Sequence, residues 1–205
     1  MDSVWEKDVT MPEFPALEGD LRTDVLVIGG GLAGLLCARA LSRAGVDCVL
    51  IEENRLMHGV SGRTTAKATA QHGLIYGKLL QKFGPEKARL YWQANRDALD
   101  ALRALAQEAD CDWETQNNYL YQTDGTDKLE AELAACQRLD IPNLWEDSLP
   151  LPFPVAGAIC FDQQAQFHPL KFAAAMAEKL RIFEHTKVLE LAPGRAKTSR
   201  GAIRA

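Results

Sequence analysis

Residues 23–52 read TDVLVIGGGLAGLLCARALSRAGVDCVLIE, and this stretch decides the fold. Residues 25–28 form a continuous apolar run, typical of a strand buried on both faces of a parallel sheet. The run ends at a glycine cluster: Gly29 permits a tight turn, Gly31 lets the backbone approach a bound group, and Gly34 lets the following helix pack closely on the strand. A strand, a glycine turn and a helix in this order predict the start of a βαβ unit.

The expected helix, residues 32–44, points its N-terminus at the turn, where free N–H groups and the helix dipole favour an anion such as pyrophosphate. Gly45 ends the helix, and a second strand follows at residues 46–51. Glu52 lies about 20 residues after the glycines, where a carboxylate accepts hydrogen bonds from ribose hydroxyls and repels a 2′-phosphate. The unit therefore predicts an adenine-dinucleotide cofactor; the alternative is a Rossmann-like scaffold without a ligand.

The bulk composition is that of an ordinary globular chain. Hydrophobic residues make up 47% of the 205 positions and charged residues 25%, which allows one large domain or two small ones. The net charge of −5, without a Lys/Arg cluster, argues against a nucleic-acid partner. Residues 1–20 are acidic and contain proline but no apolar segment, so we expect neither a signal peptide nor a membrane span, and a cytoplasmic protein.

The five cysteines do not suggest a metal site. They are odd in number and widely spread, without a Cys-x-x-Cys motif or a Cys/His pair at metal spacing. We expect reduced, mostly buried thiols. Cys37 and Cys48 fall inside the βαβ unit, where a small hydrophobic side chain suits the position.

A long polar segment, residues 53–73, follows the second strand without periodic structure. Long loops of this kind in compact domains are usually functional or disordered. Gly59 and Gly62 allow close approach, and the cofactor contacts expected here are hydroxyl and charge-assisted hydrogen bonds from Ser61, Arg63, Thr64 and Thr65. The alternative is a solvated surface loop.

Downstream, helical periodicity and short apolar stretches replace the βαβ pattern. Helices are expected at 74–83, 86–109, 126–139 and 168–180, the first ending at Gly84-Pro85. Strands are expected at 113–115, 119–123, 155–161, 165–167, 181–184 and 186–191.

Several motifs accompany the glycine turn and Glu52: SVWE at residues 3–6, TTAK at 64–67, QHGLIY at 71–76 and QAQFHPL at 164–170. With these motifs the sequence resembles the FAD-dependent oxidoreductases of the D-amino-acid oxidase and glycine/sarcosine oxidase superfamily. It is most similar to a bacterial branch that often carries a C-terminal Rieske domain. The resemblance covers essentially the whole chain, but no Cys-x-His pair for a Rieske cluster is present.

The resemblance implies FAD as the cofactor and oxidation of the C–N bond of a small amine or amino acid. An electron-acceptor partner or a homo-oligomer is compatible with it. Val188 would meet the adenine through its backbone, and the alternative for this residue is a plain core position. The complete set of expected cofactor contacts is Gly29, Gly30, Gly31, Leu32, Ala33, Gly34, Glu52, Glu53, Ser61, Arg63, Thr64, Thr65, Ala66 and Val188.

No universal catalytic base follows from the resemblance. His72 and Lys67, polar residues of the loop, are our candidates for groups near the flavin, with His72 first because its pKa suits acid–base chemistry at physiological pH. The alternative for both is an exposed or structurally hydrogen-bonded side chain.

The predicted fold is α/β, a Rossmann-like FAD-binding βαβ domain with an α+β substrate-side module. We expect an N-terminal extension at 1–22, an FAD-binding part with a helical segment at 23–110, a substrate-side part at 111–180 and a return to the FAD-binding domain at 181–205. Members of the resembled family continue beyond the point that corresponds to residue 205, so we expect a truncated chain.

Two other functions stay open. The first is a non-catalytic module that binds FAD or an adenine nucleotide. The second is an NAD-dependent dehydrogenase, for which Glu52 is equally suitable but the long loop after it is not. A bound yellow chromophore separates the flavoenzyme from the dehydrogenase.

Gly31→Val is expected to abolish cofactor binding and leave the secondary structure largely intact, because a branched side chain would occupy the pyrophosphate position. Binding measurements together with circular dichroism check this expectation. Wild-type affinity in the variant would contradict the site assignment.

Overall fold

The computed structural model describes residues 3–205; residues 1 and 2 of the expected N-terminal extension lie outside the described residues. The described chain forms two compact units. The first comprises residues 3–65, 108–111 and 168–205, and the second comprises residues 66–107 and 112–167. The functional parts expected at 23–110, 111–180 and 181–205 stay a prediction.

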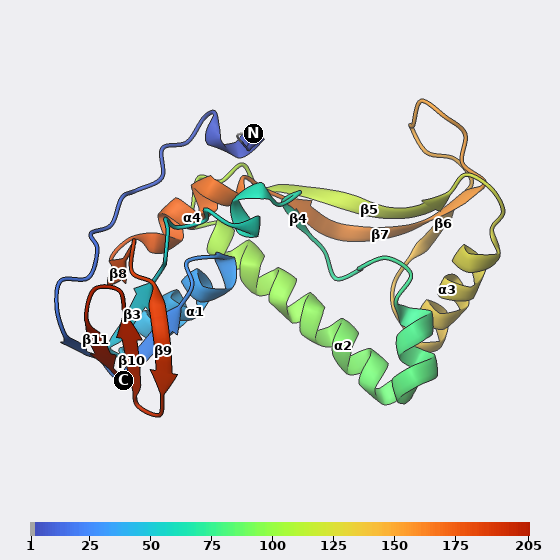
Figure 1. The fold of residues 1–205 in the computed structure, drawn as a ribbon. Helices are drawn as coiled ribbons and strands as arrows, with labels where there is room; N and C mark the ends of the chain where they lie inside the picture. Colours follow the sequence, from blue (N-terminus) through green and yellow to red (C-terminus); the bar gives the residue numbers. More distant parts are fainter. Residues whose placement is uncertain (1–2) are drawn as a thin grey trace. The chain divides into compact units, whose positions relative to one another are not determined.

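The first unit begins with a short helical turn and contains the βαβ unit. Its elements are η1 (Val4–Glu6), β1 (Leu21–Arg22), β2 (Val25–Ile28), α1 (Leu32–Arg43), β3 (Cys48–Ile51), η2 (Val60–Arg63), α4 (Pro169–Ala177), β8 (Ile182–Phe183), β9 (Val188–Ala192), β10 (Arg195–Thr198) and β11 (Ala202–Arg204). The second unit contains β4 (Lys67–Ala68), α2 (Tyr76–Ala106), β5 (Glu114–Gln122), α3 (Asp127–Arg138), β6 (Leu144–Glu146) and β7 (Gly157–Gln166). Figure 1 shows these elements along the chain.

A parallel sheet in the order β2-β3-β8 forms the centre of the first unit. Val49, Leu50 and Ile51 of β3, the central strand, are almost completely buried. Residues 25–28 of β2 are only half-buried to exposed, with Ile28 49% exposed, so the burial expected for them on both faces was wrong because β2 lies at the edge of this sheet. The predicted α/β class is confirmed. The second strand begins at Cys48, two residues later than expected.

A second sheet of the first unit has the order β1-β11-β10-β9. Strand β1 pairs with β11 in parallel, whereas the other neighbours are antiparallel. Ile203 of β11 is fully buried and belongs to a small core with Leu17, Val49 and Ile51, against which Val188 packs. The sequence reading missed β1, β10 and β11.

The second unit combines an antiparallel sheet with two helices. The sheet has the order β4-β7-β5, and β6 also pairs with β7. One strand, β5, replaces the two predicted at 113–115 and 119–123, and its register shifts between Gln116 and Asn118. Strand β7 likewise joins the stretches predicted at 155–161 and 165–167.

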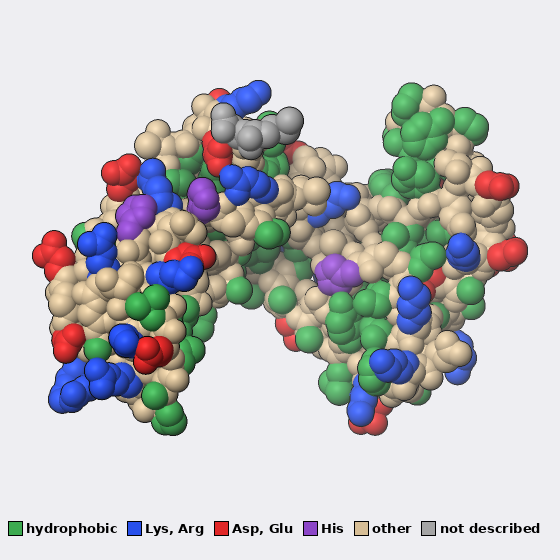
Figure 2. Space-filling model, viewed as in Figure 1, with side chains coloured by type: hydrophobic (Ala, Val, Ile, Leu, Met, Phe, Trp, Pro, Cys, Tyr) green, Lys and Arg blue, Asp and Glu red, His purple; other side chains and the backbone are tan. Residues whose placement is uncertain are grey.

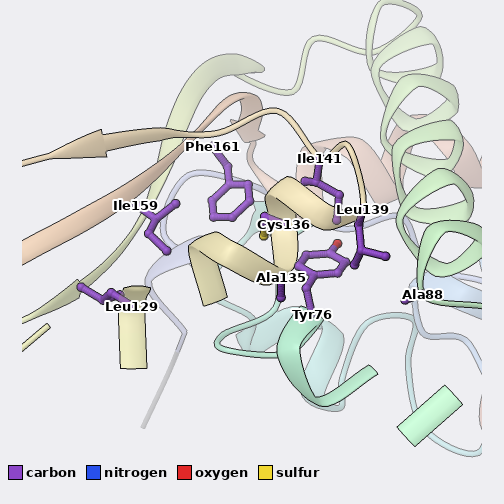
Figure 3. Close-up of a cluster of buried hydrophobic side chains, with 9 residues drawn as sticks. All are labelled: Tyr76, Ala88, Leu129, Ala135, Cys136, Leu139, Ile141, Ile159 and Phe161. Atoms are coloured by element: carbon purple, nitrogen blue, oxygen red, sulfur yellow. The ribbon is translucent and has the colours of Figure 1, made fainter. Parts of the chain in front are cut away.

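A closely packed apolar cluster joins the sheet to both helices of this unit (Figure 3). Tyr76 of α2, Cys136 of α3 and Phe161 of β7 are all almost completely buried in it. Burial raises the pKa of the Cys136 thiol to about 12 and the pKa of Tyr76 above its ordinary value. Both side chains are therefore neutral at physiological pH.

Helix α2 contains the predicted break. Gly84 has φ 79° and ψ 170°, outside the helical region, and Pro85 follows it. The positive φ favours glycine at this position. The two predicted helices are thus confirmed, and they meet at a kink at Gly84-Pro85 within the range labelled α2.

The segment expected to be without regular structure, 53–73, contains η2 and β4. Strand β4 pairs with β7, Lys67 with Gln166 and Ala68 with Ala165. The expectation was wrong here because pairing with a distant strand, not local periodicity, defines a two-residue strand.

On the face shown in Figure 2, Lys and Arg side chains are interspersed with Asp and Glu side chains. Within residues 3–205, no helix is long and apolar enough to cross a membrane. The same part of the chain contains no cluster of three or more His, Cys, Asp or Glu side chains suited to a metal ion.

A buried carboxyl group holds α2 and α3 together. Both oxygens of Glu132, a 3% exposed residue of α3, accept hydrogen bonds from the N-terminal end of α2. Oε1 accepts from the N–H groups of Ile75 and Tyr76 at 2.9 and 2.7 Å, and Oε2 from Gly77 at 2.9 Å. Glu132 thus supplies, from another helix, the cap that the start of α2 lacks.

Glu132→Ala should destabilise the protein by about 3 kcal/mol, because it leaves three N–H groups without an acceptor. Glu130→Ala, which changes an exposed residue of the same helix, should cost no more than about 0.5 kcal/mol. Urea unfolding followed by circular dichroism measures both. Equal losses in the two variants would contradict the capping role.

Candidate functional site

The turn between β2 and α1 depends on glycine at two positions. Gly29 has φ 105°, and its N–H donates to the Ile51 carbonyl at 2.8 Å. A Cβ atom added to Gly34 would lie 2.0 Å from the Gly29 carbonyl oxygen. Helix α1 can therefore approach the end of β2 this closely because Gly34 has no side chain, as the sequence predicted.

The N-terminus of α1 has no side-chain cap from its own N-cap residue, but a hydroxyl of the following loop accepts a hydrogen bond there. Gly31 is the N-cap and provides no side chain. The Ser61 Oγ of η2 accepts a hydrogen bond from the Leu32 N–H at 3.2 Å. Ala33, next in the helix, is exposed. The structure thus brings Ser61 to the helix end predicted to bind phosphate.

Gly31 also faces this hydroxyl. An added Cβ at Gly31 would lie 2.9 Å from Ser61 Oγ, so a larger residue disturbs the loop as well as the space expected for a pyrophosphate. Loss of cofactor binding in Gly31→Val would therefore have two causes.

Glu52 lies directly against the glycine turn. Its Oε2 accepts a hydrogen bond from the Gly30 N–H at 2.7 Å, and its Oε1 accepts from the Asn54 N–H at 2.8 Å. A Cβ at Gly30 would lie 3.1 Å from Glu52 Cβ and 2.5 Å from Leu56 Cδ2, so glycine is required for this approach. Two carboxyl oxygens offer about four acceptor positions, which leaves capacity for ribose hydroxyls.

An ion pair links Glu53 to Lys187, the residue just before Val188 and strand β9. The Glu53 carboxyl group pairs with Lys187 Nζ at 3.1 Å, and both side chains are more than half exposed. A pair this exposed contributes little to stability. Val188 follows Lys187 and is half-buried against the core around Leu17 and Val49. Its packing is that of a core position, the alternative expected for this residue. The contact of its backbone with adenine stays a prediction.

The remaining loop residues are placed differently from Ser61. Arg63 is exposed and its guanidinium donates to the His58 carbonyl, so the structure does not bring it to the α1 terminus. The Thr64 carbonyl accepts a hydrogen bond from the Trp5 indole at 2.9 Å, and Thr65 is exposed. Ala66 begins the second unit and has φ 57°.

The two catalytic candidates both belong to the second unit. His72 is exposed, and its Nδ1 lies 3.0 Å from the Tyr91 hydroxyl. Lys67 lines a cavity of about 290 Å³, and His72 does not. The cavity lining is rich in amide and aromatic side chains: Thr69, Gln116, Asn117, Asn118, Tyr119, Tyr121, Leu149, Pro150, Leu151, Gln164, Ala165 and Gln166.

The sequence reading missed a buried carboxyl group that organises the first unit. Glu184 is 1% exposed; its Oε1 accepts from the Leu56 N–H at 2.7 Å and its Oε2 from the Phe14 N–H at 3.1 Å. The contact at Leu56 fixes the chain just after Glu52. Its sequence context, an acidic residue at the end of a short strand, has no feature that distinguishes it from a surface carboxylate.

These residues fit an adenine dinucleotide. The α1 terminus would provide N–H donors for the diphosphate, Ser61 a hydroxyl beside it, and Glu52 acceptors for a ribose. At positions 30 and 31 the neighbouring side chains leave no room for a Cβ atom, so glycine suits both positions. Fold and site together define the dinucleotide-binding class of βαβ proteins.

Comparison with known proteins gives the family. Residues 24–205 match the family model described as FAD dependent oxidoreductase, and the chain belongs to this family. A Bacillus subtilis protein, YhfW, which bears the name of a Rieske 2Fe–2S iron–sulfur protein, is 37% identical over 202 residues, or 94% of this chain and 40% of that protein. Gamma-glutamylputrescine oxidoreductase of Escherichia coli is 24% identical over 209 residues, or 94% of this chain and 49% of that protein.

Solved structures agree on the fold. Glycine oxidase from Geobacillus kaustophilus has a TM-score of 0.71 at 20% identity, covering 90% of this chain and 53% of that one. L-proline dehydrogenase from P. horikoshii has a TM-score of 0.67 at 16% identity, with 93% and 51% covered. The chain thus spans about half the length of these relatives or less.

A mutant cycle on Gly31 and Ser61 tests the geometry without any ligand. Gly31→Ala should destabilise the wild-type chain by about 1–2 kcal/mol, because the added methyl group meets Ser61 Oγ. In a Ser61→Gly background the same substitution should cost less than half as much, since the oxygen is absent. Additive losses of unfolding free energy would contradict the contact.

Proposed function

We propose that this chain binds FAD, with its first unit holding the ADP half, and that the full enzyme oxidises the C–N bond of a small amine or amino acid. The observation that carries the proposal is the convergence of Ser61 and Glu52 on the glycine turn. Ser61 reaches the N-terminus of α1 from 29 residues away, and Glu52 accepts from the Gly30 N–H within the turn. Backbone N–H donors at the start of a helix suit a diphosphate.

In this proposal each group has a distinct task. The Ala33 N–H and the Ser61 hydroxyl, which the Leu32 N–H holds in place, bind the diphosphate. Glu52 keeps its bonds to the turn while its remaining lone pairs accept from the ribose. Its negative charge also disfavours a 2′-phosphate on that ribose.

When bound, the flavin supplies acceptance of a hydride equivalent from the substrate. The proposed substrate position is the cavity of the second unit, whose lining offers amide donors and acceptors beside Tyr119 and Tyr121. Lys67 is the cation of that lining and suits the carboxylate of an amino acid. We therefore place Lys67 ahead of His72, the reverse of the order expected from sequence.

The relatives support the substrate class and the acceptor. One relative is named gamma-glutamylputrescine oxidoreductase, and similar folds include glycine oxidase and L-proline dehydrogenase. All three names refer to amine or amino-acid compounds. A further relative is named for a Rieske cluster, which supports an iron–sulfur centre as the electron acceptor. A cytoplasmic location remains part of the proposal.

Glu52→Gln should weaken the binding of FAD and of ADP about tenfold, because it removes the negative charge that accepts from the ribose. Binding of FMN, which has no adenosine, should change little. Fluorescence titration of the purified chain measures FAD and FMN, and calorimetry measures ADP. Equal losses for FAD and FMN would contradict the assignment of Glu52 to the adenosine ribose.

A further inference from the structure

The N-terminal turn of the first unit lies beside the loop that carries Ser61. Ser3 and Glu6 form a reciprocal capping box around η1: Trp5 N–H donates to Ser3 Oγ at 3.4 Å, and Ser3 N–H donates to Glu6 Oε2 at 3.2 Å. Turn η1 contacts both η2 and α4, and Figure 1 shows the N-terminal turn beside α4. The turn is therefore a folded part of the first unit.

Trp5 connects this turn to two fixed partners. Its indole N–H donates to the Thr64 carbonyl, 59 residues away, at 2.9 Å. The edge of its ring meets the His168 ring at a centroid distance of 5.1 Å and an interplanar angle of 69°. His168 is itself held, since its Nδ1 accepts from the Lys171 N–H at the start of α4 and its N–H donates to Cys111 at 2.7 Å.

The bond from Trp5 determines where the next N–H points. A trans peptide is planar, with its C=O and N–H pointing in opposite directions. Fixing the Thr64 carbonyl toward Trp5 therefore directs the Thr65 N–H away from Trp5. Thr65 is exposed, and within residues 3–205 its N–H donates no hydrogen bond.

The loop is anchored at its other end as well. Ser61 Oγ accepts from Leu32, and a Cβ at Gly62 would lie 2.1 Å from the Met57 carbonyl oxygen, so the chain is tightly packed there. With Trp5 holding Thr64, the five-residue segment from Ser61 to Thr65 is restrained on both sides. A free, oriented donor at the end of a restrained loop is suited to a ligand acceptor.

We propose that Trp5 is a positioning residue: it orients the Thr64–Thr65 peptide so that the Thr65 N–H donates to an acceptor atom of FAD. This inference rests on the proposed function and adds the N-terminal turn to the cofactor site. Trp5 itself touches no part of the cofactor.

The test compares Trp5→Phe with Trp145→Phe in the purified chain. Trp5→Phe keeps an aromatic ring against His168 but removes the indole N–H. Trp145→Phe also removes an indole donor, the one that meets Asp147 at 2.8 Å in the second unit. FAD affinity should fall about fivefold in Trp5→Phe and stay at the wild-type value in Trp145→Phe. The visible spectrum of the bound flavin should shift in Trp5→Phe alone.

A second variant separates positioning from a loss of structure. Thr65→Pro removes the N–H, and the extended Thr64 (φ −67°, ψ 160°) is the conformation that a following proline favours. If Trp5 acts through this N–H, Trp5→Phe should cause no further loss of FAD affinity in the Thr65→Pro background.

Wild-type affinity in Trp5→Phe, or additive losses in the double variant, would overturn the inference and leave the proposed function standing. A folded wild-type chain that binds no FAD would contradict the proposed function itself, and the inference with it.

Discussion

The first unit depends on the close approach of helix α1 to the end of strand β2, at Gly34 and the Gly29 carbonyl. A Cβ atom added at Gly34 would lie 2.0 Å from that carbonyl oxygen. Because the helix approaches the strand this closely, its N-terminus is directed at the end of the parallel sheet. Glu52, at the end of the neighbouring strand, then meets the Gly30 N–H. The positions proposed for the phosphate and the ribose follow from this one approach of backbone to backbone.

Around this centre, side chains from distant segments satisfy backbone groups that local structure leaves open. Ser61 meets the first N–H of α1, Glu132 meets three N–H groups at the start of α2, and Glu184 joins Leu56 to Phe14. Buried polar groups of this kind are costly unless each is paired. They therefore restrain the loops that follow β3 and β4.

Sequence predicted those features that neighbouring residues determine. The apolar run of β2, the glycine turn, the helix after it and the break at Gly84 depend on local conformation, and all are present. Strands β10 and β11 were missed because they are short, and β10 carries polar side chains whose role becomes clear only through pairing. The break expected within β5 became a register shift for the same reason.

In the candidate site, too, local features could be predicted from the sequence, and contacts between distant residues could not. Spacing after the glycines suggested Glu52, and the hydroxyl-bearing composition of the loop suggested Ser61. The structure brings both to the turn, whereas Arg63 donates to the His58 carbonyl. Partners 59 and 128 residues apart, Trp5 with Thr64 and Glu184 with Leu56, have no local signature. The sequence shows that Trp5 belongs to the SVWE motif, but only the structure shows its hydrogen bond to Thr64.

The most direct test of the account is the visible absorption spectrum of the purified 205-residue chain after incubation with FAD and removal of the excess. The account predicts flavin bands that stay with the protein at about one flavin per chain. A chain that is folded by circular dichroism but elutes colourless would contradict it.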